Sequence, residues 1–205
     1  ATILPRARAA KNGSANDTIQ LGIIGVGSKA RGHIEHLLGL EGVRIVALCD
    51  VDAANLDHGQ SILREQGVRA KGYRDMRRLL DNPEVDAVVI VTPNHWHALA
   101  TIWACQAGKD VYVEKPVTHN LWEGKKVVEA ARKYKRVVQA GTQNRSDTGF
   151  RQAIEYIREG RIGKTQWMHG LWFKERKSLG RVPGPQVIPD GVDYDLWTGP
   201  APMEP

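Results

Sequence analysis

The sequence predicts an α/β protein built on a doubly wound parallel sheet, and three observations carry this prediction. Short apolar runs alternate with helical patterns from residue 19 onward, the run at residues 85–91 (VDAVVIV) is apolar almost throughout, and glycines follow the first run. Strands that alternate with helices need right-handed crossovers and form a parallel sheet. A strand covered on both faces is apolar at nearly every position. Ligands bind such sheets beyond the carboxyl ends of the strands.

Six strands fit this pattern, with helices between them. The apolar runs lie at residues 19–24, 43–49, 85–91, 111–113 and 137–140, of which the last three are the fourth, fifth and sixth strands. The helical patterns lie at residues 28–40, 52–65, 75–80, 95–107, from 120 onward and from 147 to 160. Asn120 with Glu123 predicts a capping box, Asp147 predicts an N-cap, and Gly108 and Gly160 are stop signals.

The pattern changes at both ends of the chain. Residues 1–18 have no periodicity and predict an N-terminal arm. The aromatic run at residues 165–173 predicts a strand, whereas residues 178–205 hold six of the ten prolines. We therefore expect an arm at 1–18, the sheet domain at 19–146, and a linking helix with the start of a truncated α+β second domain at 147–205.

Composition excludes several classes of function. The 205 residues are 41% hydrophobic and 25% charged, as in ordinary globular domains. No apolar run reaches the roughly 20 residues that span a bilayer, so we expect no membrane insertion. The net charge is +6, but the basic residues are dispersed, and we expect no nucleic-acid partner. Cys49 and Cys105 lie far apart in apolar segments, which predicts two buried thiols and no metal site.

A glycine-rich segment follows the first strand. Residues 25–30 (GVGSKA) fit the pattern G-x-G-x-x-G/A between a strand and a helix. Gly25 permits a tight turn, Gly27 lets the backbone approach a pyrophosphate, and Ala30 is small enough for close helix–strand packing. The helix N-terminus supplies free N–H groups for phosphates. The predicted cofactor-binding set here is Gly25, Gly27, Ser28, Lys29, Ala30 and Arg31. The alternative is a tight turn without a ligand, with Lys29 and Arg31 solvated.

Asp50 ends the second strand, 25 residues after Gly25. A carboxylate at this place accepts the ribose hydroxyls of NAD and repels the 2′-phosphate of NADP. The next residues are Val51 and Asp52 rather than an arginine, so the sequence favours NAD over NADP. The alternative is an acid that caps the next helix, a role that Asp52 fits better.

Two more strand ends carry polar residues. Thr92 to His97 (TPNHWH) leads from the fourth strand into a helix, where Pro93 suits the turn and Asn94 the N-cap. Glu114-Lys115-Pro116 ends the fifth strand. A lysine at the carboxyl edge of a sheet beside a dinucleotide is well placed for acid/base chemistry; the alternative is a surface charge. A cis Lys115-Pro116 bond is compatible with this turn.

These segments together resemble one family. The glycine loop, ALCDVD (47–52), VTPNHWHA (91–98), VEKPVTHN (113–120) and GTQNRS (141–146) occur in the order seen in the Gfo/Idh/MocA oxidoreductases, over roughly residues 19–175. The E-K-P motif is the most specific of them. The resemblance implies a Rossmann-like fold, NAD as cofactor and a sugar or polyol as substrate.

The resemblance also implies roles for single residues. Lys115 is then the catalytic residue, which contacts nicotinamide and substrate. The residues implied to bind the cofactor are Thr92, Pro93, Asn94, His97, Glu114, Lys115 and Gln143. The residues implied to bind the substrate are Lys115, Asn144 and Arg145.

Three expectations concern the protein as a whole. Family members are about 1.5–2 times as long, so we interpret the chain as truncated before most of its substrate domain, and expect a homo-oligomer in the full-length protein. ATILPRARAA (1–10) and DYDLWTGPAP (193–202) resemble a bacterial subgroup exported through the twin-arginine route. We therefore expect a periplasmic protein, with the cytoplasm as the alternative.

Several functions remain open at this point. The first is an NAD-dependent oxidoreductase that transfers hydride from a carbinol carbon, with Lys115 taking the hydroxyl proton. The second is a glycosidase that oxidises its substrate transiently, as some relatives in the family do. The third is a non-catalytic dinucleotide-binding module. A methyltransferase fits less well, because its chemistry does not call for the Glu114-Lys115-Pro116 turn.

Overall fold

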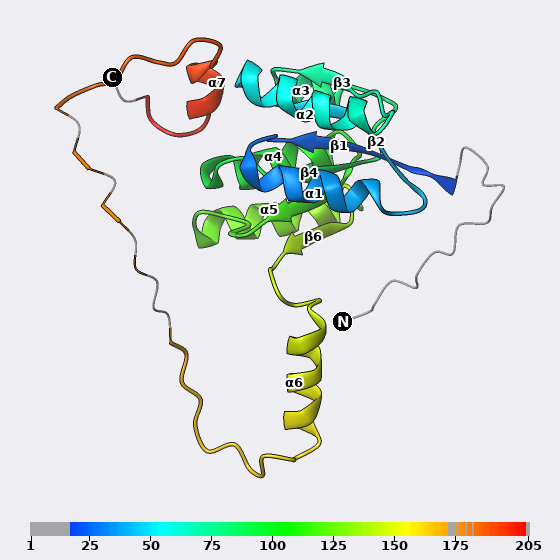
Figure 1. Cartoon of the computed structure of the whole chain (residues 1–205), viewed down its shortest axis with the longest axis vertical. Helices are drawn as coiled ribbons and strands as arrows, with labels where there is room; N and C mark the ends of the chain where they lie inside the picture. The colour runs from blue at the N-terminus through cyan, green and yellow to red at the C-terminus, as the bar shows by residue number, and fades with distance from the viewer. Residues whose placement is uncertain (1–16, 172–174, 176, 179, 182, 204–205) are drawn as a thin grey trace. The chain divides into compact units, whose positions relative to one another are not determined.

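The computed structural model describes residues 17–171, 175, 177–178, 180–181 and 183–203 (Figure 1). The strands are β1 (Ile19–Ile24), β2 (Val43–Cys49), β3 (Lys71–Tyr73), β4 (Ala87–Ile90), β5 (Asp110–Glu114) and β6 (Val138–Gly141). The helices are α1 (Ser28–Leu38), α2 (Ala53–Glu65), α3 (Met76–Leu80), α4 (Asn94–Gln106), α5 (Leu121–Lys133), α6 (Thr148–Arg158) and α7 (Tyr194–Thr198).

All six strands form one parallel sheet in the order β3-β2-β1-β4-β5-β6. The chain moves outward from β1 to β3 and then returns to place β4 on the other side of β1. This reversal is the switch point of a doubly wound Rossmann-like sheet, where ligands bind. The predicted fold class is therefore confirmed, and the carboxyl ends of β1 and β4 mark the place for a site.

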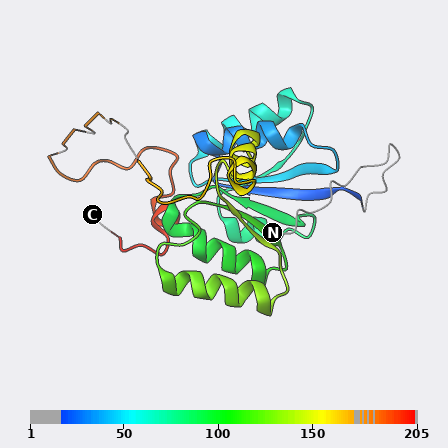
Figure 2. The ribbon, with the colours of Figure 1, turned by 90° about the horizontal axis from the view of Figure 1, so that it is seen from below.

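Two hydrophobic layers cover the sheet. In Figure 2, α1 and α2 lie on one side of the strands and α4 and α5 on the other. Ile34 of α1 and Leu63 of α2 pack with Ile23 and Leu48 on the first face. The second face carries α3, α4 and α5, whose buried residues include Leu79, Ala100 and Ala130. Because both faces are covered, the central strands are apolar at nearly every position, as the run at 85–91 indicated.

The predicted helix starts are confirmed where an N-cap side chain accepts a backbone hydrogen bond. Asp52, Asp75 and Asn120 each accept a backbone N–H in the first turn of α2, α3 and α5. The carboxylate of Glu123 accepts the His119 N–H at 2.7 Å, which completes a capping box one residue earlier than the usual partner. Helix α4 differs, because its N-cap is Pro93 and Asn94 is already its first residue.

The chain divides into two compact units. The first comprises the sheet with its helices and residues 188–204; the second comprises residues 142–187 with α6. The domain boundary predicted at residue 146 and the truncated second domain stay predictions. The N-terminal arm also stays a prediction, because its residues 1–16 lie outside the described residues. The strand expected at 165–173 is absent over the described residues 165–171, and residues 172–173 lie outside the description. A strand needs a neighbour for its backbone hydrogen bonds, and β6 is the last strand of the sheet.

Cys49 and Cys105 are buried free thiols, as predicted. Burial raises the pKa of both, so neither is an exposed, reactive thiolate. Over the described residues, every helix is too short or too polar to cross a membrane.

Candidate functional site

The turn after β1 requires glycine at its first position. Gly25 has φ +85°, a conformation that L side chains rarely adopt, and its N–H donates to the Cys49 carbonyl at 2.8 Å. A Cβ here would lie 2.8 Å from backbone atoms of Val91 and Thr92. Gly25 thus lets the turn pass directly over the end of β4, at the switch point.

The second glycine leaves free space instead. An added Cβ at Gly27 would meet nothing within 4 Å. Gly27 is also the N-cap of α1, and no side chain caps this helix. The first N–H groups of a helix need acceptors, and with the helix dipole they favour an anion. The start of α1 therefore fits a pyrophosphate, while the fully buried Ala30 holds the helix close to the sheet.

Asp50 is held at the end of β2 by two backbone donors. Its Oδ2 accepts the Val26 N–H at 2.6 Å, and its Oδ1 accepts the Asp52 N–H at 2.9 Å. The first bond ties the carboxylate to the glycine turn. Each carboxylate oxygen has a second lone-pair direction, so Asp50 can also accept hydroxyl groups from a ligand.

Burial raises the pKa of Asp50, although N–H groups of Asp52 and Val26 counteract it. An acid with a raised pKa in the folded state favours folding most at low pH, and this contribution is lost as the pH rises through the folded value. At neutral pH the buried carboxylate therefore disfavours folding. A residue retained at such a cost is a candidate for function.

The raised pKa predicts a pH dependence of NAD binding. If Asp50 holds the ribose, its ionised carboxylate would accept the two hydroxyls and its acid form would accept less well, so NAD affinity should fall as the pH drops through the pKa of Asp50. This loss should begin above the ordinary value of 3.8. Calorimetric titrations with NAD from neutral pH downward measure it, with Asp50→Asn as the matched variant. A profile in wild type as flat as in Asp50→Asn, while the fold persists, would contradict this assignment.

The Glu114-Lys115-Pro116 turn follows β5, and its first residue is anchored. Glu114 is buried, and its Oε1 lies 2.9 Å from Nε2 of His33 on α1. The His33 ring also packs edge-on against Tyr112. Burial and the nearby Glu114 carboxylate raise the pKa of Tyr112. Lys115 is exposed, and its bond to Pro116 is cis. The structure thus fixes the base of the turn and leaves the lysine amine open to solvent.

His97 connects two strand ends inside the protein. Its side chain is 1% exposed, with Nδ1 2.6 Å from the Pro116 carbonyl oxygen and Nε2 2.8 Å from the Thr92 carbonyl oxygen. It therefore joins the end of β4 to the turn that carries Lys115. Both ring nitrogens face carbonyl groups of the chain, and the contact of His97 with the cofactor stays a prediction.

Loss of this link should destabilise the domain. We expect His97→Leu to lower the free energy of unfolding by about 1–3 kcal/mol, because the ring N–H that donates to one of the two buried carbonyl groups is lost. Chemical denaturation measures the change. The control is His58→Leu, since His58 is exposed on α2. Equal stability of both variants would show that the two contacts contribute nothing.

One cavity of about 790 Å³ gathers much of the predicted site. The predicted residues that line it are Gly25, Gly27, Ser28, Lys29, Asp50, Thr92 and Pro93. Among the described residues the Thr92 hydroxyl oxygen is buried without a hydrogen-bond partner, as are Arg31 Nε and the Thr198 hydroxyl oxygen. The predicted residues of the same unit that lie outside the cavity lining are Ala30, Arg31, Asn94, His97, Glu114 and Lys115.

The remaining predicted residues belong to the second unit. Gln143, Asn144 and Arg145 lie in an exposed turn before α6, and Asn144 has φ +64°. The roles predicted for individual residues stay predictions.

The cavity also contains residues that the sequence interpretation did not assign. These are chiefly Arg74 after β3, the apolar residues Met76, Trp96, Leu99 and Trp103, and residues between 189 and 200. Trp96 stands inside the quoted segment VTPNHWHA, so its position was a usable signal. Arg74 and the residues after 189 gave no such signal, because only the fold brings them to the cavity.

A parallel sheet in this order, with a glycine turn at the switch point and an acid ending the second strand, defines a dinucleotide-binding α/β domain. Residues 19–142 match the Gfo/Idh/MocA model, described as "Oxidoreductase family, NAD-binding Rossmann fold", and the chain belongs to this family.

Known proteins agree with this assignment. Inositol 2-dehydrogenase of Salmonella typhimurium is 34% identical over 181 residues, which are 87% of this chain and 53% of that protein. A glycosyl hydrolase family 109 protein of Shewanella pealeana is 35% identical over 123 residues, which are 56% of this chain and 26% of that protein. The chain thus spans about half the length, or less, of these curated relatives.

Solved structures show the same domain. Myo-inositol 2-dehydrogenase from Lactobacillus plantarum superposes with a TM-score of 0.66 at 30% identity, over 72% of this chain and 43% of that one. Scyllo-inositol dehydrogenase from Lactobacillus casei, with bound NAD(H) and scyllo-inositol, gives a TM-score of 0.65 at 27% identity, over 71% of this chain and 42% of that one.

Proposed function

We propose that this chain binds NAD and forms the cofactor half of an oxidoreductase acting on a carbinol carbon of a polyol or sugar. The observation that carries the proposal is the meeting of the glycine turn, Asp50 and Thr92 in one cavity at the switch point. The turn of Lys115 follows the adjacent β5. The inositol dehydrogenases among the relatives support a polyol as the substrate class.

The residues present fit the cofactor. The uncapped N-terminus of α1 and the free space at Gly27 suit the pyrophosphate, and Asp50 suits the adenosine ribose. When bound, NAD supplies the hydride acceptor. The carboxylate of Asp50 would repel a 2′-phosphate, which supports NAD rather than NADP.

We assign Lys115 as the proton acceptor. Its Nζ takes the proton of the substrate hydroxyl while the carbinol C–H bond breaks, and returns that proton in the reverse direction. The amine is exposed, so its proton exchanges with water between turnovers. Glu114 and His97 act on Lys115 only by holding its turn against α1 and β4.

A glycosidase is the second candidate, because the family 109 protein is as similar in identity as the dehydrogenases. In such a reaction the substrate is oxidised and later reduced by the same cofactor, so NAD is not consumed. Non-catalytic dinucleotide binding is the third.

One experiment separates the three. The full-length protein, with its substrate domain, is incubated with NAD and a panel of inositols, and separately with aryl glycosides without added NAD. We expect NADH to accumulate with a polyol, and less with NADP as cofactor. Release of the aryl group without added NAD would establish the glycosidase instead. NAD binding without turnover of either panel would support the third candidate, non-catalytic dinucleotide binding. Absence of NAD binding would refute the proposal.

Two proposals concern the whole protein. We propose export to the periplasm by the twin-arginine route, supported by the resemblance of residues 1–10 and 193–202, of which 1–10 lie outside the described residues. Fractionation of cells tests it, and recovery in the cytoplasm would contradict it.

We also propose that the full-length protein is a homo-oligomer. Light scattering measures its mass in solution, and the mass of a monomer would contradict this proposal.

A further inference from the structure

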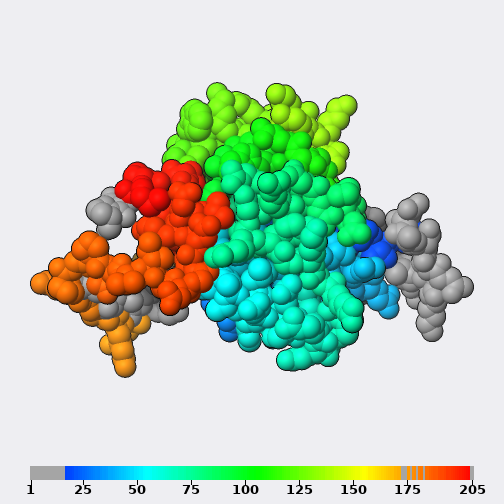
Figure 3. Space-filling model, turned by 90° about the horizontal axis from the view of Figure 1, so that it is seen from above, coloured from blue at the N-terminus to red at the C-terminus, as the bar shows by residue number. Residues whose placement is uncertain are grey.

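A segment near the end of the chain closes one side of the cavity. Residues 189–200, which we call the C-terminal strap, include α7 and lie outside the family match at residues 19–142. The strap belongs to the same compact unit as the sheet. Figure 3 shows it, in orange to red, lying against the surface of that unit.

The first half of the strap is bonded to the segment that follows Asp50. The Asp193 N–H donates to the Val51 carbonyl at 3.0 Å, and the Ala53 N–H donates to the Gly191 carbonyl at 3.2 Å. The Arg74 guanidinium donates to the same Gly191 oxygen at 2.7 Å. These bonds hold the strap beside the residue that is predicted to bind the ribose.

The second half is bonded to the start of α4. The Trp96 indole N–H donates to the Leu196 carbonyl at 3.0 Å, and Nε2 of His95 lies 2.9 Å from the Trp197 carbonyl oxygen. Gly199 packs so closely on the Trp96 ring that a Cβ would overlap the ring atoms. The strap thus bridges the ends of β2 and β4, the two strands on either side of β1.

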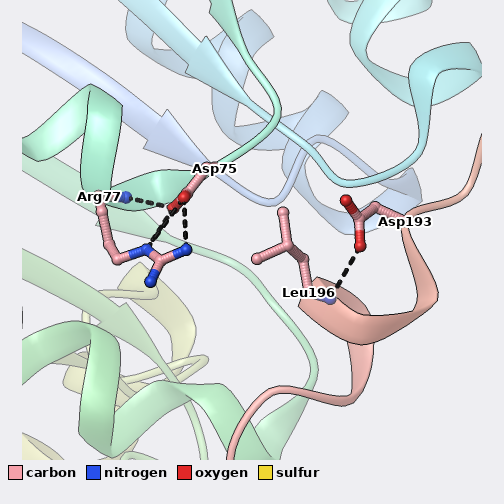
Figure 4. Close-up of polar contacts among 4 residues, drawn as sticks. All are labelled: Asp75, Arg77, Asp193 and Leu196. Atoms are coloured by element: carbon pink, nitrogen blue, oxygen red, sulfur yellow. Dashed lines mark hydrogen bonds and ion pairs between the residues drawn. The ribbon is translucent and has the colours of Figure 1, made fainter.

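Between these two attachments the strap faces the cavity. Asp193 accepts the Leu196 N–H at 3.0 Å and so fixes the short helix α7. Figure 4 shows the Leu196 side chain on the side of Asp75 and Arg77, which form a bidentate ion pair. Leu196 and the three side chains of Met76, Leu99 and Trp103 all line the cavity. The cavity that Asp50 lines thus also has apolar and aromatic groups in its lining, which suit a flat heterocyclic base, beside the charged Arg74, Asp75 and Arg77.

We propose that the C-terminal strap is a wall of the adenine subsite, with Leu196 as its principal contact. The inference rests on the proposed function, because Asp50 must hold the adenosine ribose. A dinucleotide with its ribose at Asp50 extends its base into the same cavity, whose lining includes Met76, Leu99 and Leu196. Binding of the base then requires the strap in its docked position.

The variants Leu196→Ala and Gly199→Ala test the contact and the docking separately. The control is Met203→Ala, since Met203 is exposed and outside the cavity lining. Affinities are measured by calorimetry for NAD, ADP-ribose and nicotinamide mononucleotide. We expect Leu196→Ala to weaken NAD and ADP-ribose alike by about tenfold, as the loss of one buried apolar contact implies. Gly199→Ala should weaken both at least as much. Binding of the mononucleotide should not change.

Hydrogen exchange in the wild-type protein gives a second readout that does not depend on a variant folding. The backbone N–H groups of Asp193, Leu196 and Trp197 are all hydrogen-bonded in the docked strap. A ligand that needs the docked strap slows their exchange. We expect ADP-ribose to protect these amides and the mononucleotide to leave them unchanged.

The outcomes distinguish this inference from the proposed function. If Gly27→Val loses NAD while the strap variants bind ADP-ribose like wild type and the strap amides exchange unchanged, the strap inference is refuted and the function stands. If wild type binds neither NAD nor ADP-ribose, both are refuted. Equal weakening of the mononucleotide would also refute it, because the strap would then act on the whole fold.

Discussion

Gly27→Val is expected to remove NAD binding while the fold stays intact. An added Cβ meets no protein atom within 4 Å, so we expect the fold to accept the side chain. The same side chain would occupy the approach to the N–H groups of α1. Hydrogen bonds to a charged group contribute about 1.5–3 kcal/mol each, so we expect affinity to fall at least about 100-fold, or about 2.7 kcal/mol. The increase in NADH fluorescence on binding measures the loss.

The matched control is Gly32→Val on the same helix. Its Cβ would also meet nothing within 4 Å, and Gly32 is not part of the cavity lining. Gly25→Val provides the contrast, because strain and overlap with the end of β4 should unfold the turn itself. If Gly27→Val bound NADH as tightly as Gly32→Val, the glycine segment would be a structural turn only.

Lys115→Met is expected to separate catalysis from cofactor binding. The variant removes the amine and keeps most of the aliphatic chain, so NAD affinity should change by less than about threefold. Loss of a general acid/base lowers turnover typically by about 10²- to 10⁴-fold. We therefore expect kcat of the full-length protein for polyol oxidation to fall within this range.

Lys125→Met is the control for this prediction, since Lys125 is an exposed lysine on α5. Turnover of Lys115→Met equal to that of the control would assign the proton to another group. A parallel loss of NAD binding would show that the cofactor contact implied for Lys115 contributes more to affinity than expected here.

The sequence was sufficient for the sheet because its strands are buried on both faces. The apolar runs at residues 19–24, 43–49 and 85–91 form the central strands of the sheet. Their apolar composition was enough to find them. β3 differs, because Lys71 and Gly72 are exposed at the sheet edge and leave no apolar run. The sequence indicated β3 only indirectly, because six strands were expected and only five apolar runs were found.

The site could be predicted from the sequence where its residues directly follow a strand. Gly25, Gly27 and Asp50 each stand directly at a strand end, and all three line the cavity. His97 was harder, because a histidine one helical turn after a strand end faces the cofactor or the core depending on the helix start. Helix α4 begins at Asn94, and this places His97 against the Thr92 and Pro116 carbonyl groups.

The strap shows the limit of local patterns. Its contacts join residues about 100 apart in the sequence, such as His95 with Trp197. Its residues have neither helical nor strand periodicity over a useful length. Only the folded sheet brings the carbonyl groups of residues 191–197 within reach of Arg74 and Trp96.

A crystal structure of this chain with NAD tests the central claim most directly. We predict the adenosine ribose hydroxyls within hydrogen-bond distance of the Asp50 carboxylate and the pyrophosphate against the N–H groups at the start of α1. A dinucleotide bound elsewhere, or an Asp50 side chain turned away from the ribose, would contradict the account.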